Sequence, residues 1–271
     1  MEVILNSGAA MPQLGFGCMI PPADTTEAVT RAIEVGYRSL DTATDYGNEV
    51  EVGRAIAAVD VPRDALFVTT KLLNTDHGRD NTLRAFDASL SALGLEHVDL
   101  YLIHWPVPAW DLYVETWKAL VELRQDGRAR AIGVSNFQIP HLERIIDATG
   151  VVPAVNQIEL HPLFQQGELR AFHAQAGIVT EAWSPLAQGL ALSSPTVSEL
   201  AERHLRSPGQ IVLRWHLQLG SVAIPKSVTP QRIAENFAVL DFELDEHEMD
   251  QLQALDAGTR TGPHPDTFIE D

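Results

Sequence analysis

The sequence has little of what many binding or membrane-anchored proteins carry. It holds one cysteine, Cys18, only three lysines and no long apolar run. A single cysteine excludes an internal disulfide, and Cys18 is predicted to act as a small buried hydrophobe. No apolar stretch approaches the length that crosses a bilayer, and the first residues lack the basic start and apolar run of a signal peptide. We therefore expect a cytoplasmic protein with no membrane partner.

Positive charge is also scarce, because 19 Lys and Arg stand against 37 Asp and Glu and give a formal net charge of -18. Such a surface repels the phosphate backbone of nucleic acids, so no nucleic-acid partner is predicted. The ten histidines include no pair at metal-ligand spacing with a third ligand, so no metal site is predicted. The sequence says little about oligomeric state, and a monomer is the default expectation.

What the chain does have is a regular alternation of short apolar runs with amphipathic stretches. The stretches repeat apolar residues at helical spacing, as at Leu83, Phe86, Leu90 and Leu93. Eight strand-helix units with strands apolar on both faces predict an α/β fold, a (β/α)8 TIM barrel that forms one domain over 1–271. The eight strands are predicted at 14–18, 38–41, 66–71, 98–104, 129–135, 154–159, 178–183 and 222–226.

Other segments refine this barrel. Residues 3–5 and the turn Asn6-Ser7-Gly8 predict an N-terminal β-hairpin that closes the bottom of the barrel. Two helices are predicted in 193–220, and extra C-terminal helices follow the last strand, one of them in the acidic run 241–250. Asn48 is expected to cap a helix. An open doubly wound sheet is the alternative, but Gly15 and Gly17 have no third glycine in register.

Polar residues stand where several predicted strands end, and the loops there converge on one rim of a barrel. Asp41, Lys71 and His104 end three of these strands, and Tyr46 follows Asp41 closely. An ammonium held by a carboxylate stays protonated, and beside a phenol it is expected to lower the phenol's pKa, which makes Tyr46 a usable proton donor. Taken singly, Asp41 could be a cap, Lys71 a rim cation and His104 a hydrogen-bonded structural residue.

A second cluster is predicted after the last strand. Lys226, the Ser227 hydroxyl and Arg232 stand near the start of a helix opened by Thr229-Pro230. Two cations and exposed helix N–H groups suit a phosphate. The alternative is a capped helix with ordinary surface cations.

Four motifs in order carry a family resemblance. The run 36–53 (GYRSLDTATDYGNEVEVG), the segment 103–106 (IHWP), the segment 133–137 (GVSNF) and the segment 224–227 (IPKS) resemble the signatures of the aldo-keto reductases. The chain looks most like bacterial members similar to 2,5-diketo-D-gluconate reductases. The resemblance implies NADPH as cofactor and a catalytic tetrad of Asp41, Tyr46, Lys71 and His104, with Tyr46 as general acid.

The resemblance also implies roles around the cofactor. Ser135, Asn136 and Gln157 correspond to groups that bind the nicotinamide carboxamide, and Trp183 corresponds to the ring that stacks on the nicotinamide. The remaining implied contacts are Ser184, Leu186, Gln188 and Gly189 along the pyrophosphate, Lys226, Ser227 and Arg232 at the 2′-phosphate, and Glu235 and Asn236 at the adenine.

The substrate pocket departs from the family pattern, because Met19 and Leu72 stand where aromatic residues are common. The predicted pocket residues are Met19, Leu72, Trp105, Trp110 and Phe268. Short loops predict an open, adaptable mouth, so we expect NADPH-dependent reduction of aldehydes, α-dicarbonyls and keto sugars to alcohols. The alternatives are a cofactor-sensing or structural barrel, and an enzyme that uses NADH.

Overall fold

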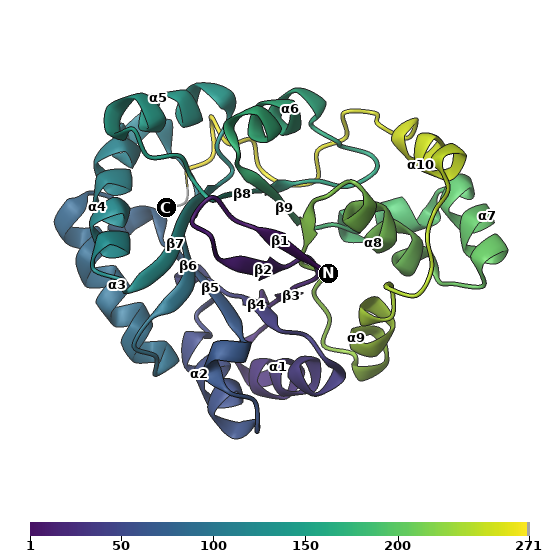
Figure 1. Ribbon diagram of the computed structural model, residues 1–271, viewed down its shortest axis with the longest axis horizontal. Helices are drawn as coiled ribbons and strands as arrows, with labels where there is room; N and C mark the ends of the chain where they lie inside the picture. Colours follow the sequence, from purple (N-terminus) through teal and green to yellow (C-terminus); the bar gives the residue numbers. More distant parts are fainter. Residues whose placement is uncertain (270–271) are drawn as a thin grey trace.

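The central element of the computed structural model is a parallel sheet in which the strands follow one another in chain order (Figure 1). The structure describes residues 1–269. Its strands are β3 (Phe16–Gly17), β4 (Ser39–Asp41), β5 (Phe67–Leu72), β6 (Val98–Ile103), β7 (Ala129–Ser135), β8 (Val155–Glu159), β9 (Val179–Trp183) and β10 (Val222–Ala223). Residues before β3 bond to the last strand, since Gly15 donates its N–H to the carbonyl oxygen of Ala223 at 2.9 Å. This contact closes the sheet and confirms the predicted (β/α)8 barrel.

Helices surround the barrel and cover the outer face of the strands (Figure 1). They are α1 (Pro22–Val35), α2 (Glu49–Ala58), α3 (Arg79–Leu93), α4 (Tyr113–Gln125), α5 (Ile139–Thr149), α6 (Gly167–Ala176), α7 (Pro195–His204), α8 (Pro208–Gln218), α9 (Pro230–Phe237) and α10 (Glu246–Gln253). The pairs predicted in 193–220 and after the last strand are present as α7 with α8 and α9 with α10. No helix among residues 1–269 has both the length and the apolar character to cross a membrane.

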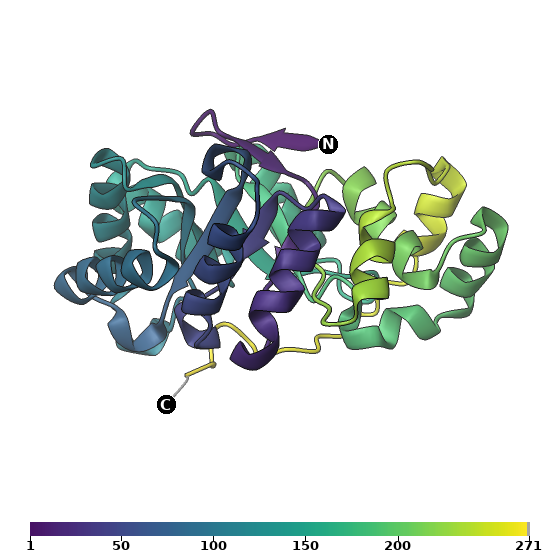
Figure 2. The same ribbon diagram turned by 90° about the horizontal axis from the view of Figure 1, so that it is seen from below.

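The N-terminal hairpin consists of β1 (Glu2–Ile4) and β2 (Ala10–Pro12) and lies over one end of the barrel (Figures 1 and 2). Its Leu5 and Met11 are buried in one cluster with barrel residues such as Leu100 and Leu102. Burying these apolar side chains together removes them from water and fills the barrel interior at this end. The predicted plug is therefore confirmed, and the interior of the barrel is closed at this end.

The expectation for Asn48 needs a correction. Asn48 does precede α2, but its side chain caps no helix N–H. Its amide instead donates to the carbonyl oxygens of Cys18 at 2.7 Å and Ile20 at 2.9 Å, and its oxygen accepts the Thr42 hydroxyl at 2.7 Å. Asn48 is fully buried, and these bonds tie the loop after β3 to the loop after β4. The hydrogen bonds of Asn48 thus fix the loop that carries Tyr46.

Candidate active site

A cavity of about 320 Å³ opens where the parallel strands end, opposite the hairpin. We call it the central cavity. Three faces of different chemistry meet there: a buried charged corner, a floor of amide and hydroxyl groups, and a wall of aromatic rings. Its lining residues are Gly17, Met19, Asp41, Asp45, Tyr46, His104, Trp105, Ser135, Asn136, Gln157, Trp183, Ser184, Pro185, Gln188, Ile224, Lys226, Gly262, Pro263 and Phe268.

The charged corner is built around Lys71 in β5. Its side chain is 0% exposed, and its ammonium donates to Asp41 Oδ1 at 2.5 Å, to the carbonyl oxygen of Thr42 at 2.9 Å and to the Tyr46 hydroxyl at 3.3 Å. An ammonium has three N–H donors, so all of them have partners. Parallel neighbours β4 and β5 bring Asp41 and Lys71 together, and the short helix Thr44–Tyr46 brings the phenol over them.

The electrostatics of this corner agree with one sequence expectation and contradict another. Burial alone would lower the pKa of Lys71, but the Asp41 carboxylate together with Tyr46 and Glu181 outweighs it, so the net pKa is raised and the ammonium stays charged. For Tyr46 the expected lowering of the phenol pKa is wrong as a net effect. Burial, together with the Asp41 and Asp45 charges, raises the pKa of Tyr46 by more than Lys71 lowers it. The hydroxyl therefore keeps its proton at neutral pH.

His104 follows β6 and completes this side of the cavity. Its ring centroid lies 5.9 Å from that of Tyr46. Burial, and then the nearby Lys71 charge, hold the pKa of His104 well below its ordinary value. A neutral imidazole has one N–H donor and one acceptor nitrogen, so His104 can donate a single hydrogen bond.

The floor of the cavity is a chain of hydrogen bonds between residues at the ends of β7, β8 and β9. The Trp183 indole N–H donates to Asn136 Oδ1 at 2.8 Å, and Asn136 Nδ2 donates to Ser135 Oγ at 3.1 Å. Gln157 Nε2 donates to Asp41 Oδ2 at 2.7 Å. The floor and the charged corner therefore form one connected network of buried polar groups.

This geometry can be set beside known proteins. The family model described as "Aldo/keto reductase family" matches residues 13–257. The chain belongs to the aldo/keto reductase family. Its match to this family confirms the predicted resemblance and the predicted class of oxidoreductase that acts on carbonyl groups.

The relatives of this aldo/keto reductase span nearly the whole chain. "Methylglyoxal reductase DkgA" of Escherichia coli is 52% identical over 267 residues, with 97% of this chain and 96% of the relative covered. An "Aldo-keto reductase" of Mycobacterium sp. is 55% identical over 267 residues, covering 98% of this chain and 97% of the relative. The Gox0644 variant solved in complex with NADPH has a TM-score of 0.96 at 50% identity and covers 100% of this chain and 99% of that one. That neighbour holds the cofactor predicted here from the sequence.

The loop after β9 has an unusual backbone in this aldo/keto reductase. Ser184, Ala187 and Gln188 all have positive φ, at 47°, 52° and 53°. Such conformations cost energy in residues other than glycine and gather at ligand-binding sites. Ser184 and Gln188 line the central cavity, whereas Leu186 packs against the hydrophobic core, and Gly189 lies beside Gln188 in the same turn.

The predicted phosphate cluster lies beyond this loop, around the start of α9. Lys226 lines the cavity and is exposed, as is Arg232, and neither makes an ion pair within residues 1–269. Ser227 Oγ accepts the N–H of Thr229 at 3.1 Å, which shapes the turn into α9. Glu235 and Asn236 lie on α9, half-buried and buried respectively.

Three of the five predicted substrate residues line the central cavity. Met19 is 61% exposed at its rim, and Trp105 packs against Phe268 with ring centroids 4.4 Å apart. Leu72 instead lies in the hydrophobic core, and Trp110 packs near His77, at 6.4 Å between ring centroids. Neither is among the described residues that line the cavity. The C-terminal tail supplies Gly262 and Pro263 as well as Phe268, so it covers more of the mouth than the short loops predict.

Sequence reasoning missed Glu181 in β9, which is fully buried beneath the floor. Its Oε2 accepts Gln157 Nε2 at 2.8 Å, so the Gln157 amide group bridges two carboxyl groups, those of Asp41 and Glu181. Burial, and then the Asp41 charge, raise the pKa of Glu181. One signal was present in the sequence, because an acidic residue stands inside the apolar run 178–183.

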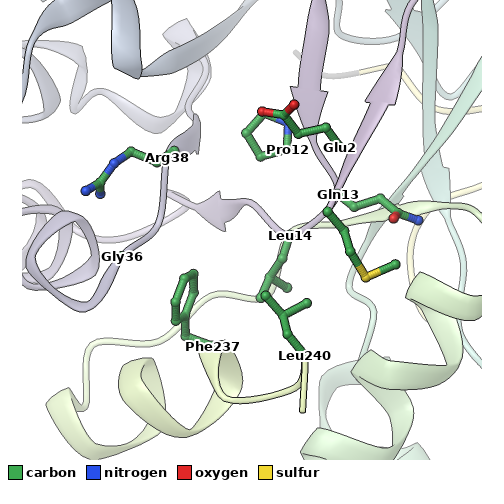
Figure 3. Close-up of a pocket in the computed structure, with 9 residues that line it drawn as sticks. Glu2, Pro12, Gln13, Leu14, Gly36, Arg38, Phe237 and Leu240 are labelled. Atoms are coloured by element: carbon green, nitrogen blue, oxygen red, sulfur yellow. The ribbon is translucent and has the colours of Figure 1, made fainter. Parts of the chain in front are cut away.

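A second hollow lies at the opposite end, between the hairpin and α9 (Figure 3). It is lined by residues that include Glu2, Leu14, Arg38 and Phe237. Arg38 Nη1 donates to the carbonyl oxygens of Ile33 at 2.9 Å and of its neighbour Tyr37 at 2.8 Å, so this nitrogen of the guanidinium already has partners in the fold. Within residues 1–269 no group of three or more His, Cys, Asp and Glu could hold a metal ion.

Proposed function

We propose that the protein uses NADPH to reduce aldehydes, α-dicarbonyls and keto sugars to alcohols, with Tyr46 as general acid. One observation carries this proposal: the fully buried Lys71 ammonium is bonded to Asp41 and to the Tyr46 hydroxyl at the wall of an open cavity. When bound, NADPH supplies the hydride that the carbonyl carbon receives.

Tyr46 gives its proton to the carbonyl oxygen as that oxygen gains negative charge. Because burial keeps the phenol protonated, the proton is present when it is needed. The Lys71 ammonium, 3.3 Å from the Tyr46 oxygen, stabilises the phenolate that remains. Asp41 holds Lys71 charged and in place, and the neutral His104 donates one hydrogen bond that orients the carbonyl oxygen.

The lining of the cavity fits the cofactor. The floor formed by Ser135, Asn136 and Gln157 offers hydroxyl and amide groups to a carboxamide, and Trp183 offers an aromatic ring for stacking. The strained loop of Ser184, Leu186, Gln188 and Gly189 is assigned to the pyrophosphate. Lys226 and Arg232, which make no ion pair within residues 1–269, are assigned with Ser227 to the 2′-phosphate, and Glu235 and Asn236 to the adenine. These cations favour NADPH over NADH.

The substrate class follows from the rest of the wall. Met19, Trp105 and Phe268 give an apolar surface with one flexible side chain, which accepts small carbonyl compounds of several shapes. A relative named methylglyoxal reductase supports an α-dicarbonyl as the first substrate to test. Broad specificity, and not one dedicated substrate, is the expected outcome.

The test measures oxidation of NADPH with methylglyoxal by the wild type, Tyr46→Phe and Tyr101→Phe. Tyr101 is a matched control, because its buried hydroxyl has no hydrogen-bond partner among the described residues. Tyr46→Phe should lose at least about a hundredfold in kcat, the usual size of general acid catalysis, and should keep its affinity for NADPH. Equal turnover by Tyr46→Phe and wild type would contradict the assignment. Tight NADPH binding without turnover of any carbonyl compound would favour a sensing or structural role.

A further inference from the structure

The strongest feature outside the proposed reaction is the buried carboxylate of Glu159 at the end of β8. Its side chain is 0% exposed. Its Oε1 accepts the backbone N–H of Thr261 at 2.5 Å and the Thr261 hydroxyl at 2.6 Å, and its Oε2 accepts the N–H of Gly262 at 3.1 Å. One side chain therefore holds the C-terminal tail, defined here as 259–268, by three hydrogen bonds.

Both carboxylate oxygens of Glu159 also have side-chain partners. His161 Nε2 lies 3.1 Å from Oε1, and the Arg260 guanidinium lies 3.6 Å from Oε2 while it stacks over the Phe164 ring at 4.4 Å. Burial raises the pKa of Glu159, but the hydrogen bonds from His161, Thr261 and Gly262 outweigh it and bring the pKa to about 2. At neutral pH the group is a carboxylate, and hydrogen bonds to a carboxylate are about twice as strong as neutral ones.

The tail held in this way presses on Trp183. A Cβ atom added to Gly262 would lie 2.4 Å from Cη2 of the Trp183 ring, which shows that only a glycine backbone fits against the ring here. Glu159 and Trp183 are also register partners across β8 and β9. On its other edge the ring is fixed by the bond from its N–H to Asn136. Figure 2 shows the tail crossing the end of the barrel opposite the hairpin.

We infer that Glu159 is a positioning residue that holds the C-terminal tail against Trp183. This one buried carboxylate then determines the position of the tail over the central cavity and the position of the Trp183 ring. Where Trp183 stacks on the nicotinamide, as in the function proposed above, loosening the tail weakens cofactor binding as well as substrate contacts. A tail that served only as a substrate cover would leave cofactor affinity unchanged.

The first measurement is trypsin cleavage of the bond after Arg260, which needs no activity. In the wild type the Arg260 side chain and the N–H of Thr261 are both engaged by Glu159. Glu159→Gln places an amide N–H₂ where the Gly262 N–H or Arg260 requires an acceptor. Release of the peptide after Arg260 should become at least about tenfold faster. The control Glu202→Gln changes an exposed glutamate of α7 in the same way and should cleave like the wild type.

The second measurement is the dissociation constant of NADPH, followed by quenching of tryptophan fluorescence. We expect it to rise at least about fivefold in Glu159→Gln and in Gly262→Ala. Gly167→Ala, where the added Cβ meets nothing within 4 Å, should bind like the wild type. If Glu159→Gln does not fold, Thr261→Val keeps the side-chain shape, removes only the hydroxyl bond to Glu159 and carries the same two tests.

The outcomes are separable. Unchanged cleavage in folded Glu159→Gln overturns the inference that Glu159 holds the tail. Faster cleavage with unchanged NADPH affinity overturns the coupling to Trp183. Failure of the wild type to bind NADPH would contradict the proposed function and with it the coupling, while the cleavage comparison would still decide whether Glu159 holds the tail.

Discussion

Replacing Lys71 by methionine tests the charged corner as a structural unit. The side chain is fully buried, and its ammonium contacts Asp41, Thr42 and Tyr46. Methionine has a similar length but no charge, so Lys71→Met leaves the buried Asp41 carboxylate with Gln157 as its remaining hydrogen-bond donor. Breaking a buried ion pair by removing one partner costs about 3–5 kcal/mol, because the other charge stays buried without its counter-ion.

The measurement is urea unfolding followed by circular dichroism at neutral pH. The chain supplies its own control, because Lys118 on α4 is exposed and makes no ion pair among the described residues. Lys118→Met should change the free energy of unfolding by no more than about 0.5 kcal/mol, as is usual for surface positions. If Lys71→Met were no less stable than Lys118→Met, the ion pair would not hold this corner of the barrel, and the argument that Asp41 keeps Lys71 charged and in place would fail.

Three further predictions concern other parts of the molecule. Gly53→Ala should lower the free energy of unfolding by about 1–3 kcal/mol in the same urea assay, because the new Cβ would lie 2.3 Å from the carbonyl oxygen of Leu93. An unchanged free energy of unfolding would show that α2 and α3 are not tightly packed at Gly53. Cys18 is fully buried, which raises the pKa of its thiol, so a thiol reagent should label it only as fast as the protein unfolds, and rapid labelling of the native protein would contradict this burial. Burial raises the pKa of Glu181 from 4.5 to about 8, so between these pH values the folded state holds a proton that the unfolded state has lost. This group therefore makes the free energy of unfolding fall as pH rises from about 4.5 to about 8. Urea midpoints of Glu181→Gln should lack this fall, and identical pH slopes in variant and wild type would exclude the contribution of Glu181.

Local patterns predicted much of the fold. The apolar runs predicted the strands in order, and the Thr229-Pro230 signal agrees with the observed start of α9. The residues at strand ends, such as Asp41 and Lys71, could be expected to meet because neighbouring parallel strands end on one rim. These inferences need only short stretches of sequence.

Properties that depend on depth or on distant segments could not be read in this way. The sign of the Tyr46 pKa shift depends on burial, which is set only when the loops assemble around the phenol. Asn48 matched a cap signal, but its side chain found partners in the loop after β3. Glu159 was visible as a strand-end residue, yet its partner Thr261 lies 102 residues away in the chain. Non-local contacts of this kind follow from the assembled barrel and not from any motif.

The hairpin that fills one end of the barrel determines from which side small molecules can reach the central cavity. Leu5 and Met11 pack with interior barrel residues, so side chains fill the barrel at this end and the central cavity opens at the other end. In the proposed reaction, cofactor and substrate would therefore both reach the central cavity from its open end. The closed end thereby restricts access for both molecules to one face of the barrel.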